Sequence, residues 1–451
     1  DKILLMNLKL IFIFVFAFLI RLIGLNQSLW LDEATTTKVV KQFSYLSIIN
    51  QFSPFDFHPP LYYLLMKFWT SIFGYSEVVL RMPSVIFSLI TGYIVYRIGK
   101  LLAGEEIGIW ASLLFLFNPL IVYYSQEARM YMTTTMFLTG GVYYFLKYQA
   151  DKSNIKNIFF MNLCFLLSFF SFYGAIFLIL AILFYLLYEK QYQNFLITFL
   201  FLLFSLILVN PLLNIQLTNA KIALTNVSQW SLVLGKANIK NLFLIPIKFS
   251  LGRIDFYPKW LYYLIAGLWT FYVIFCLFLN LKIKNYQIFI LSYLLILPIV
   301  FGFFISLFIP LLQYFRFLYL VTLLSLLLSF GDKFKKKILV SGFFIFSIIY
   351  LLNPQFHRED WRSLVRSLKA HPPVYMILSS SDPLFYYRPD LKIYDLKKIT
   401  ANHLPKKISV IPYTASIHGV FYEKFLLSKN YSLIKKQSFH RLYLEEWEKL
   451  K

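Results

Sequence analysis

The sequence has little charge and almost no cysteine, and each shortage excludes a class of protein. Only 14% of the 451 residues are charged, whereas 59% are hydrophobic. Soluble domains carry about 25% charged residues, so this chain has too little polar surface to cover a water-soluble globule or to remain unfolded. Its two cysteines, Cys164 and Cys276, both lie inside apolar runs. This placement excludes a disulfide scaffold and favours core packing over a metal pair.

The sequence contains many long apolar runs. They recur up to residue 352, and each is long enough to cross a bilayer as a helix of about 20 residues. They predict a polytopic α-helical membrane protein with about eleven spanning helices, at 3–23, 80–99, 106–124, 130–148, 156–172, 173–189, 193–213, 259–280, 286–309, 312–330 and 335–352. We therefore expect residues 1–352 to form a membrane domain. The first run is interpreted as an uncleaved signal anchor, because it is longer than a signal-peptide core.

The net charge of +23 is interpreted as a topology signal and not as a nucleic-acid surface. Under the eleven-helix count, basic residues such as Lys147, Lys190 and Lys282 gather in short loops on one side. Such loops are cytoplasmic in membrane proteins. The pattern predicts a cytoplasmic N-terminus and, because the count is odd, an exterior C-terminal tail. The composition favours the plasma (inner) membrane of a bacterium.

Residues 353–451 differ from the rest in composition. The helical stretch REDWRSLVRSL is followed by two short apolar runs, VYMIL at 374–378 and ISVIPY at 408–413, and then by YSLIKKQSF and RLYLEEW. Strand candidates alternating with helical pieces predict a small exterior α/β domain.

The first predicted exterior loop, 24–79, is rich in aromatic residues. Its pieces 34–50 and 61–73 have the mixed character of helices that lie in the membrane interface. Two adjacent acids, Asp32 and Glu33, follow the first predicted span by a few residues. Acids near a membrane are costly unless they have a partner or a function. The alternative is that they cap a helix that starts at Ala34.

Three further groups of polar residues map to the same predicted exterior face. They are His58 with Tyr62 and Tyr63 in DFHPPLYY, Glu127 with Arg129 in YYSQEARMY, and Arg316 in LLQYFRFLYL. Each has a purely structural alternative: a loop–helix junction, a surface salt bridge, and an arginine that reaches the lipid headgroups. Carboxylates, a histidine and cations at one interface suit the deprotonation of a hydroxyl beside a lipid phosphate.

The blocks SLWLDEA, HPPLYYLLMKFW, SEVVLRMPS, SQEARMY and YFRFLYL resemble, in their order, the GT-C glycosyltransferases. The most similar group contains the protein O-mannosyltransferases and the lipid A aminoarabinose transferase. The resemblance implies transfer of a hexosyl or pentosyl group, with inversion, from a polyprenyl-phosphate-linked donor to an acceptor hydroxyl on the exterior face. The acceptor stays open between lipid, glycan and protein. No nucleic acid is expected as a partner.

The resemblance also implies roles for individual residues. Asp32 matches the general base of the family, Glu33 its neighbour, and Glu127 a further acid near the cavity. The donor phosphate is expected at Arg316, with Arg129 and Tyr314, and the cavity is expected to be lined by His58, Tyr62, Tyr63 and Lys67. The sequence assigns no cofactor. It leaves a divalent metal open, because several acids share one face but no strict ligand spacing is present.

Three rival functions are compatible with a basic, aromatic, multi-spanning chain. A flippase for lipid-linked saccharides would be expected to show internal repeats and helices broken at the midplane, whereas the polar residues here gather at one face. An O-antigen ligase or polymerase would carry a large exterior loop late in the chain. A non-enzymatic scaffold would tolerate the loss of Asp32.

Overall fold

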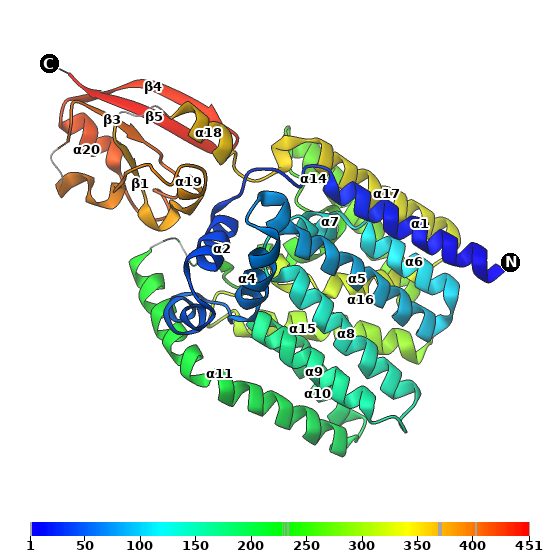
Figure 1. Ribbon diagram of the computed structural model, residues 1–451. Helices are drawn as coiled ribbons and strands as arrows, with labels where there is room; N and C mark the ends of the chain where they lie inside the picture. The colour runs from blue at the N-terminus through cyan, green and yellow to red at the C-terminus, as the bar shows by residue number, and fades with distance from the viewer. Residues whose placement is uncertain are drawn as a thin grey trace.

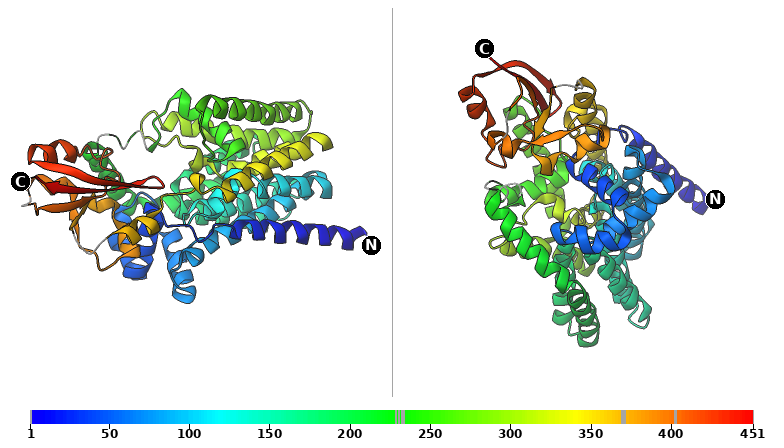
Figure 2. Two further views of the ribbon diagram at one scale, coloured as in Figure 1. Left: turned by 90° about the horizontal axis from the view of Figure 1, so that it is seen from above. Right: turned by 60° about the vertical axis from the view of Figure 1, so that its left-hand side comes forward.

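The computed structural model describes residues 2–450 except 228, 230, 232, 233, 369–371, 402 and 403. A bundle of helices makes up most of the molecule, and a small α/β domain sits at one end of it (Figure 1). The N-terminal helix α1 (Lys2–Leu22) points its free end away from that domain, which a second view confirms (Figure 2). The predicted combination of a helical membrane domain and a sheet-containing tail is therefore confirmed.

A helix lies in each of the eleven predicted runs. After α1 the bundle contains α5 (Glu77–Ala103), α6 (Glu105–Leu116), α7 (Pro119–Ser125), α8 (Tyr131–Ala150), α9 (Lys156–Ser171), α10 (Ile176–Tyr188), α11 (Tyr192–Asn226), α13 (Ile239–Leu251), α14 (Lys259–Leu281), α15 (Tyr286–Ile305), α16 (Leu320–Ser329) and α17 (Lys333–Leu352). The predicted division near residue 173 is present, because Phe172 is extended (φ −161°, ψ 120°) and ends α9.

The count of eleven spans is not confirmed. Within the described residues, four helices are long and apolar enough to cross a membrane: α5, α11, α14 and α15. A fifth is reached if α6 and α7, which meet at a 62° bend, count as one span. The helices α9 and α16 are shorter, and α17 begins with a cluster of lysines. Several such helices still make the chain a multi-pass membrane protein.

The first loop is largely helical. It contains α2 (Leu31–Gln42), three short turns, α3 (Tyr45–Ser47), η1 (Ile48–Phe52) and η2 (Ser53–Phe55), and then α4 (Leu61–Phe73). Pro60 stands immediately before α4, where a fixed φ favours a helix start. Figure 1 shows α2 between the bundle and the tail domain. The loop therefore lies at the junction of the two parts.

The tail contains one five-stranded sheet with the order β2-β1-β3-β5-β4. Strand β1 (Val374–Met376) pairs in parallel with β2 (Ile393–Asp395) and with β3 (Lys407–Val410). The hairpin of β4 (Tyr431–Phe439) and β5 (Leu442–Lys449) adds to β3 in the antiparallel sense. Three helices accompany the sheet: α18 (Trp361–Ser367), α19 (Asp382–Tyr387) and α20 (Tyr422–Ser428). Trp361, the first residue of α18, is fully buried in an apolar cluster with Val374 and Met376 of β1.

Candidate active site

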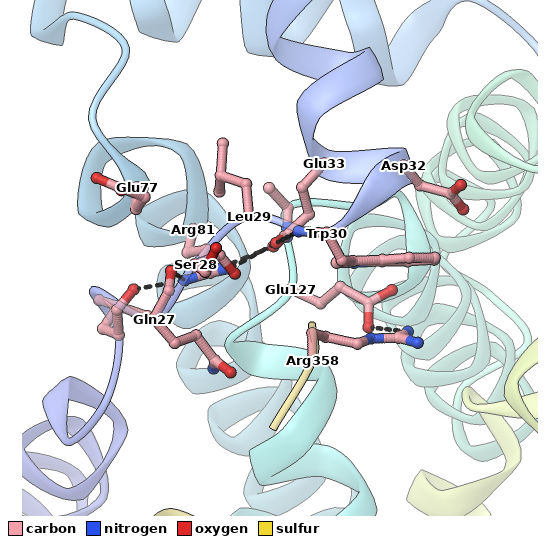
Figure 3. A network of polar contacts seen from close by, with 12 residues as sticks. Gln27, Ser28, Leu29, Trp30, Asp32, Glu33, Glu77, Arg81, Glu127 and Arg358 are labelled. Carbon is pink, nitrogen blue, oxygen red and sulfur yellow. Dashed lines mark hydrogen bonds and ion pairs between the residues drawn. The ribbon is translucent and has the colours of Figure 1, made fainter. Parts of the chain in front are cut away.

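The adjacent acids Asp32 and Glu33 lie in the first turn of α2, but they point in different directions (Figure 3). The helix begins at Leu31, three residues before the predicted Ala34, and Trp30 is its N-cap residue. Oε2 of Glu33 accepts a hydrogen bond from the Trp30 N–H at 3.5 Å, as in a capping box, so the capping alternative is confirmed for Glu33. Consecutive helical residues differ by about 100° around the axis. Glu33 therefore faces Arg81 of α5, whereas Asp32 is turned by about 100° toward Arg129.

Glu33 is held in a buried ion pair with Arg81 of α5. Arg81 donates from Nε to Oε1 at 2.9 Å and from Nη2 to Oε2 at 2.5 Å, and both side chains are 1% exposed. The backbone N–H of Ala128 donates to Oε1 at 2.8 Å. Because both oxygens are engaged, Glu33 has no free position for a substrate proton. We therefore replace its predicted catalytic role with the role of a positioning residue.

Arg81 also fixes the segment that leads into α2. Its Nη1 donates to the carbonyl oxygens of Leu25 at 2.9 Å and Gln27 at 2.6 Å, and its Nη2 donates to the carbonyl oxygen of Ser28 at 3.1 Å. A planar guanidinium with five donors can serve several acceptors at once. The start of α2, and with it Asp32, is thereby fixed to α5.

Asp32 retains an accessible carboxylate. Its side chain is 36% exposed, and Oδ2 lies 3.7 Å from Nη2 of Arg129. Arg129 is only 7% exposed and also donates from Nη1 to the hydroxyl of Tyr63 at 3.3 Å. The structure therefore brings together three predicted site residues from separate segments: the α2 start, the loop after α7, and α4.

His58 lies next to this group together with Asp56, which the sequence analysis missed. His58 Nδ1 is 3.5 Å from Asp56 Oδ1, and its ring stacks on Phe172 at 6.0 Å between centroids. Burial lowers the pKa of His58, an effect that Asp56 opposes and that Arg129 and Arg316 reinforce. His58 is therefore neutral at pH 7. The motif DFHPP, with an acid two residues before the histidine, was the available signal.

Two other residues that were predicted to line the cavity, Tyr62 and Lys67, differ from each other in their contacts. Tyr62 is 2% exposed, and its hydroxyl is buried with no hydrogen-bond partner in the described chain. It packs against the Tyr63 ring at 5.7 Å. Lys67 donates to the carbonyl oxygen of Val40 at 3.1 Å, near the C-terminal end of α2. Its predicted cavity-lining role is therefore corrected, since its ammonium group satisfies a helix end.

Glu127 pairs with the tail. Arg358 donates from Nη2 to Glu127 Oε2 at 2.9 Å, and its guanidinium lies over the Trp30 ring at 3.7 Å (Figure 3). The other oxygen of Glu127 is buried without a hydrogen-bond partner among the described residues. The alternative of a Glu127–Arg129 salt bridge is therefore wrong. A hydrogen bond from the Arg129 N–H to the Glu127 carbonyl at 2.9 Å closes a tight turn, and the two side chains find separate partners.

The late segment before α16 supplies further cations. The short helix η4 (Tyr314–Phe317) carries Tyr314 and Arg316. Arg316 donates from Nη1 to the carbonyl oxygen of Pro310 at 3.2 Å. Arg253, which follows α13, donates to the Tyr123 hydroxyl at 2.9 Å and lies over that ring at 4.7 Å. Among the described residues neither arginine forms a salt bridge with a carboxylate.

The polar side chains described above are here called the polar layer, and within the described residues they carry unpaired positive charge. They are Asp32, Asp56, His58, Tyr63, Glu127, Arg129, Arg253, Arg316 and Arg358. Arg129 and Arg358 have acidic partners, whereas the contacts of Arg253 and Arg316 within the described part of the chain are to neutral oxygens and rings. Sequence analysis missed Arg253 because it lies in a long predicted exterior loop, and it missed Arg358 because the stretch REDWRSLVRSL was assigned to the tail domain. Charged groups out of water need a counter-charge or dense hydrogen bonding, so this surplus favours an anionic ligand. No group of three or more His, Cys, Asp or Glu in the described ranges is placed to hold a metal ion.

Comparisons with known proteins give the same fold. Residues 57–215 match the family model of dolichyl-phosphate-mannose-protein mannosyltransferases. The chain is similar to ArnT from Cupriavidus metallidurans in the apo state, with 9% identity, 98% of both chains covered and a TM-score of 0.60. It is equally similar to ArnT bound to undecaprenyl phosphate, with 10% identity, 99% and 98% coverage and a TM-score of 0.59.

The archaeal oligosaccharyltransferase AglB from Archaeoglobus fulgidus, in complex with an inhibitory peptide and a dolichol-phosphate, is a further match. It shares 12% identity over 94% of this chain and 72% of its own, with a TM-score of 0.52. No curated protein matches the chain in sequence. The resemblance to the GT-C glycosyltransferases that the motifs indicated is thus confirmed in the fold.

Proposed function

We propose that this protein is a membrane glycosyltransferase that moves a sugar from a polyprenyl-phosphate-linked donor to an acceptor hydroxyl. The observation that carries the proposal is the position of Asp32. Its accessible carboxylate shares one polar layer with Arg253 and Arg316, which have no acidic partner among the residues that the structure describes. The undecaprenyl phosphate bound by ArnT and the dolichol-phosphate bound by AglB support a lipid phosphate as the anion. The transferred group is a hexosyl or pentosyl residue.

Asp32 is the proposed general base. Its carboxylate accepts the proton of the acceptor hydroxyl while that oxygen forms a bond to the anomeric carbon. The bond from the anomeric carbon to the phosphate oxygen breaks, and the polyprenyl phosphate leaves with the electron pair. A single displacement inverts the anomeric configuration. Arg129, whose Nη2 lies 3.7 Å from Asp32 Oδ2, limits the orientation of the carboxylate.

The donor phosphate is proposed to bind between Arg316 and Arg253, with Tyr314 beside them. An arginine can donate two parallel hydrogen bonds to two phosphate oxygens. Positive charge aimed at the leaving phosphate stabilises the charge that develops in the transition state. Arg129 was expected to bind the phosphate as well. Its contacts with Asp32 and Tyr63 instead favour a role in holding the base.

An apolar cavity at the proposed phosphate end of the bundle suits the prenyl chain. It has a volume of about 300 Å³ and lies between α13, α14, α15 and α16. Its lining includes Leu242, Phe249, Val273, Leu277, Leu295 and Leu324. Phe249, one of the lining residues, stands four residues before Arg253 in the sequence. The prenyl chain of the donor would stay among apolar side chains while its phosphate group reaches the polar layer.

The test is a turnover assay in proteoliposomes. Polyprenyl phosphates carrying radiolabelled mannose or 4-amino-4-deoxyarabinose are supplied together with membranes of the producing cells. The expected result is label in a product that no longer partitions as polyprenyl-phosphate sugar, with free polyprenyl phosphate released in equal amount. Movement of intact donor between leaflets, with no release of polyprenyl phosphate, would favour the flippase and contradict the proposal.

A further inference from the structure

The parallel part of the tail sheet has a topological switch point. The chain passes from β1 to β2 on one side and then places β3 on the other side of β1. In open sheets of parallel strands, ligands bind outside the carboxyl ends of the strands where the order reverses. Here that position lies beyond Met376 of β1 and Val410 of β3.

The loops beyond these two strands are rich in hydroxyl groups. Ser380 follows β1, and Tyr413 and Thr414 follow β3. The Ser380 and Thr414 hydroxyls hydrogen-bond at 2.7 Å, which joins the two loops. Thr414 has φ 62°, a conformation that is unusual for a β-branched residue and costs free energy. Such strain is concentrated at functional sites.

This edge of the tail faces the helix that carries Asp32. Asp382, at the start of α19, accepts hydrogen bonds from Thr35 at 2.8 Å and Lys38 at 2.9 Å. Thr35 is three residues after Asp32, so the two lie on one face of α2. Tyr413 packs edge-on against Trp361 at 5.0 Å. Burial raises the pKa of Tyr413, and Glu359, which also hydrogen-bonds to it, and Asp32 raise the pKa further. The Tyr413 hydroxyl therefore stays protonated beside both acids.

Glu359 adds an unsatisfied acceptor at the same place. Its Oε2 is buried and has no hydrogen-bond partner among the residues described. The preceding residue, Arg358, reaches Glu127 and Trp30 in the bundle. An unpaired buried carboxylate oxygen costs free energy unless a donor arrives from a ligand.

We infer that the switch-point edge of the tail, formed by Tyr413, Thr414 and Glu359, is the acceptor-binding half of the site and takes a hydroxyl-rich saccharide. Ser380 is 3% exposed and supports Thr414 through the hydrogen bond between their hydroxyls. The inference rests on the proposed glycosyltransferase function. Tyrosine and threonine hydroxyls and a carboxylate together supply the donors and acceptors that sugar hydroxyls need. A peptide acceptor in extended form would pair with an open sheet edge. The sheet edges here are β2 and β4, not the carboxyl ends that face α2.

The first experiment captures the acceptor in living cells. The photo-crosslinking residue p-benzoylphenylalanine replaces Tyr413 in the full-length protein, and a matched control replaces Tyr443 of β5, which is 47% exposed. We expect a light-dependent adduct at position 413 that resists protease and is destroyed by periodate, which cleaves vicinal diols. A protease-sensitive, periodate-resistant adduct would show a peptide acceptor and overturn the inference, as would equal labelling at the two positions.

The second experiment separates this inference from the proposed function. Glu359→Gln and Tyr413→Phe are assayed for transfer of labelled sugar to membranes of the producing cells and for thermal stabilisation by undecaprenyl phosphate. We expect transfer to fall at least about tenfold, as for the loss of one charged hydrogen bond of about 1.5–3 kcal/mol, while stabilisation stays at the wild-type level. Unchanged transfer in both variants overturns the acceptor site alone. A wild-type protein that neither transfers sugar nor responds to undecaprenyl phosphate overturns the proposed function.

Discussion

Replacing Asp32 by asparagine tests the proposed base most directly. The amide keeps the size of the side chain but cannot accept the proton. General bases contribute about 10²–10⁴-fold to rate, which corresponds to about 2.7–5.4 kcal/mol of activation free energy. We expect turnover to fall by this factor in Asp32→Asn.

The structure predicts that this loss occurs without unfolding. The Asp32 side chain is 36% exposed and makes one ion pair, at 3.7 Å. Partly exposed pairs contribute about 0–1 kcal/mol to the free energy of unfolding. Asp32→Asn should therefore retain the melting temperature of the wild type and its stabilisation by undecaprenyl phosphate.

The neighbouring residue provides the matched control. Glu33 is 1% exposed and bonded to Arg81 through both oxygens. Breaking a buried pair costs about 3–5 kcal/mol, because a charge is left without a partner. Glu33→Gln should thus lower the melting temperature strongly, although the substitution is chemically the same. The assay is initial rate of sugar transfer beside thermal unfolding of each purified variant. Full turnover in Asp32→Asn, or an equal fall in stability for both variants, would refute the assignment of Asp32 as the base and Glu33 as a positioning residue.

Three further outcomes are expected. Arg316→Lys should weaken donor use partially and Arg316→Ala severely, measured as initial rate against polyprenyl-phosphate-sugar concentration; equal donor dependence in all three proteins would place the phosphate elsewhere. Arg358→Met should lower the free energy of unfolding by about 3 kcal/mol by stranding Glu127, and adding Glu127→Gln should restore most of it; additive losses would contradict their pairing. Ser379→Cys, at an exposed position of the tail, should react with a membrane-impermeant thiol reagent in intact spheroplasts, and reaction only after lysis would contradict the exterior tail.

The sequence predicted the helical segments well because apolar runs report burial directly. The number of crossings is not confirmed, because length and composition do not say whether a run spans the bilayer or packs inside the protein. The helix α9 has 16 residues, and α16 has 10. Both lie in runs that looked long enough only with their flanking loops included.

For the candidate site, the sequence indicated individual residues but not their partners. The importance of Asp32, His58 and Arg316 was visible as polar residues in apolar surroundings. The partners were not visible, because each pair joins distant segments: Glu127 and Arg358 are 231 residues apart, and Lys38 and Asp382 are 344 apart. The tail was expected as a separate domain, so its residues were not considered as partners for the bundle.

These distant pairs bear on how the tail and the base interact. From the bundle side, Arg81 donates hydrogen bonds to two carbonyl oxygens of the segment before α2. From the tail side, Arg362 donates to the carbonyl of Asn26 at 2.9 Å, and the Tyr387 hydroxyl accepts from the N–H of Leu29 at 2.9 Å. The few residues that lead to Asp32 are therefore held on both sides. A displaced tail would release one of these two sets of contacts. The orientation of the proposed base thus depends on the same domain that, by our inference, binds the acceptor, so acceptor binding and alignment of Asp32 are coupled through one set of hydrogen bonds.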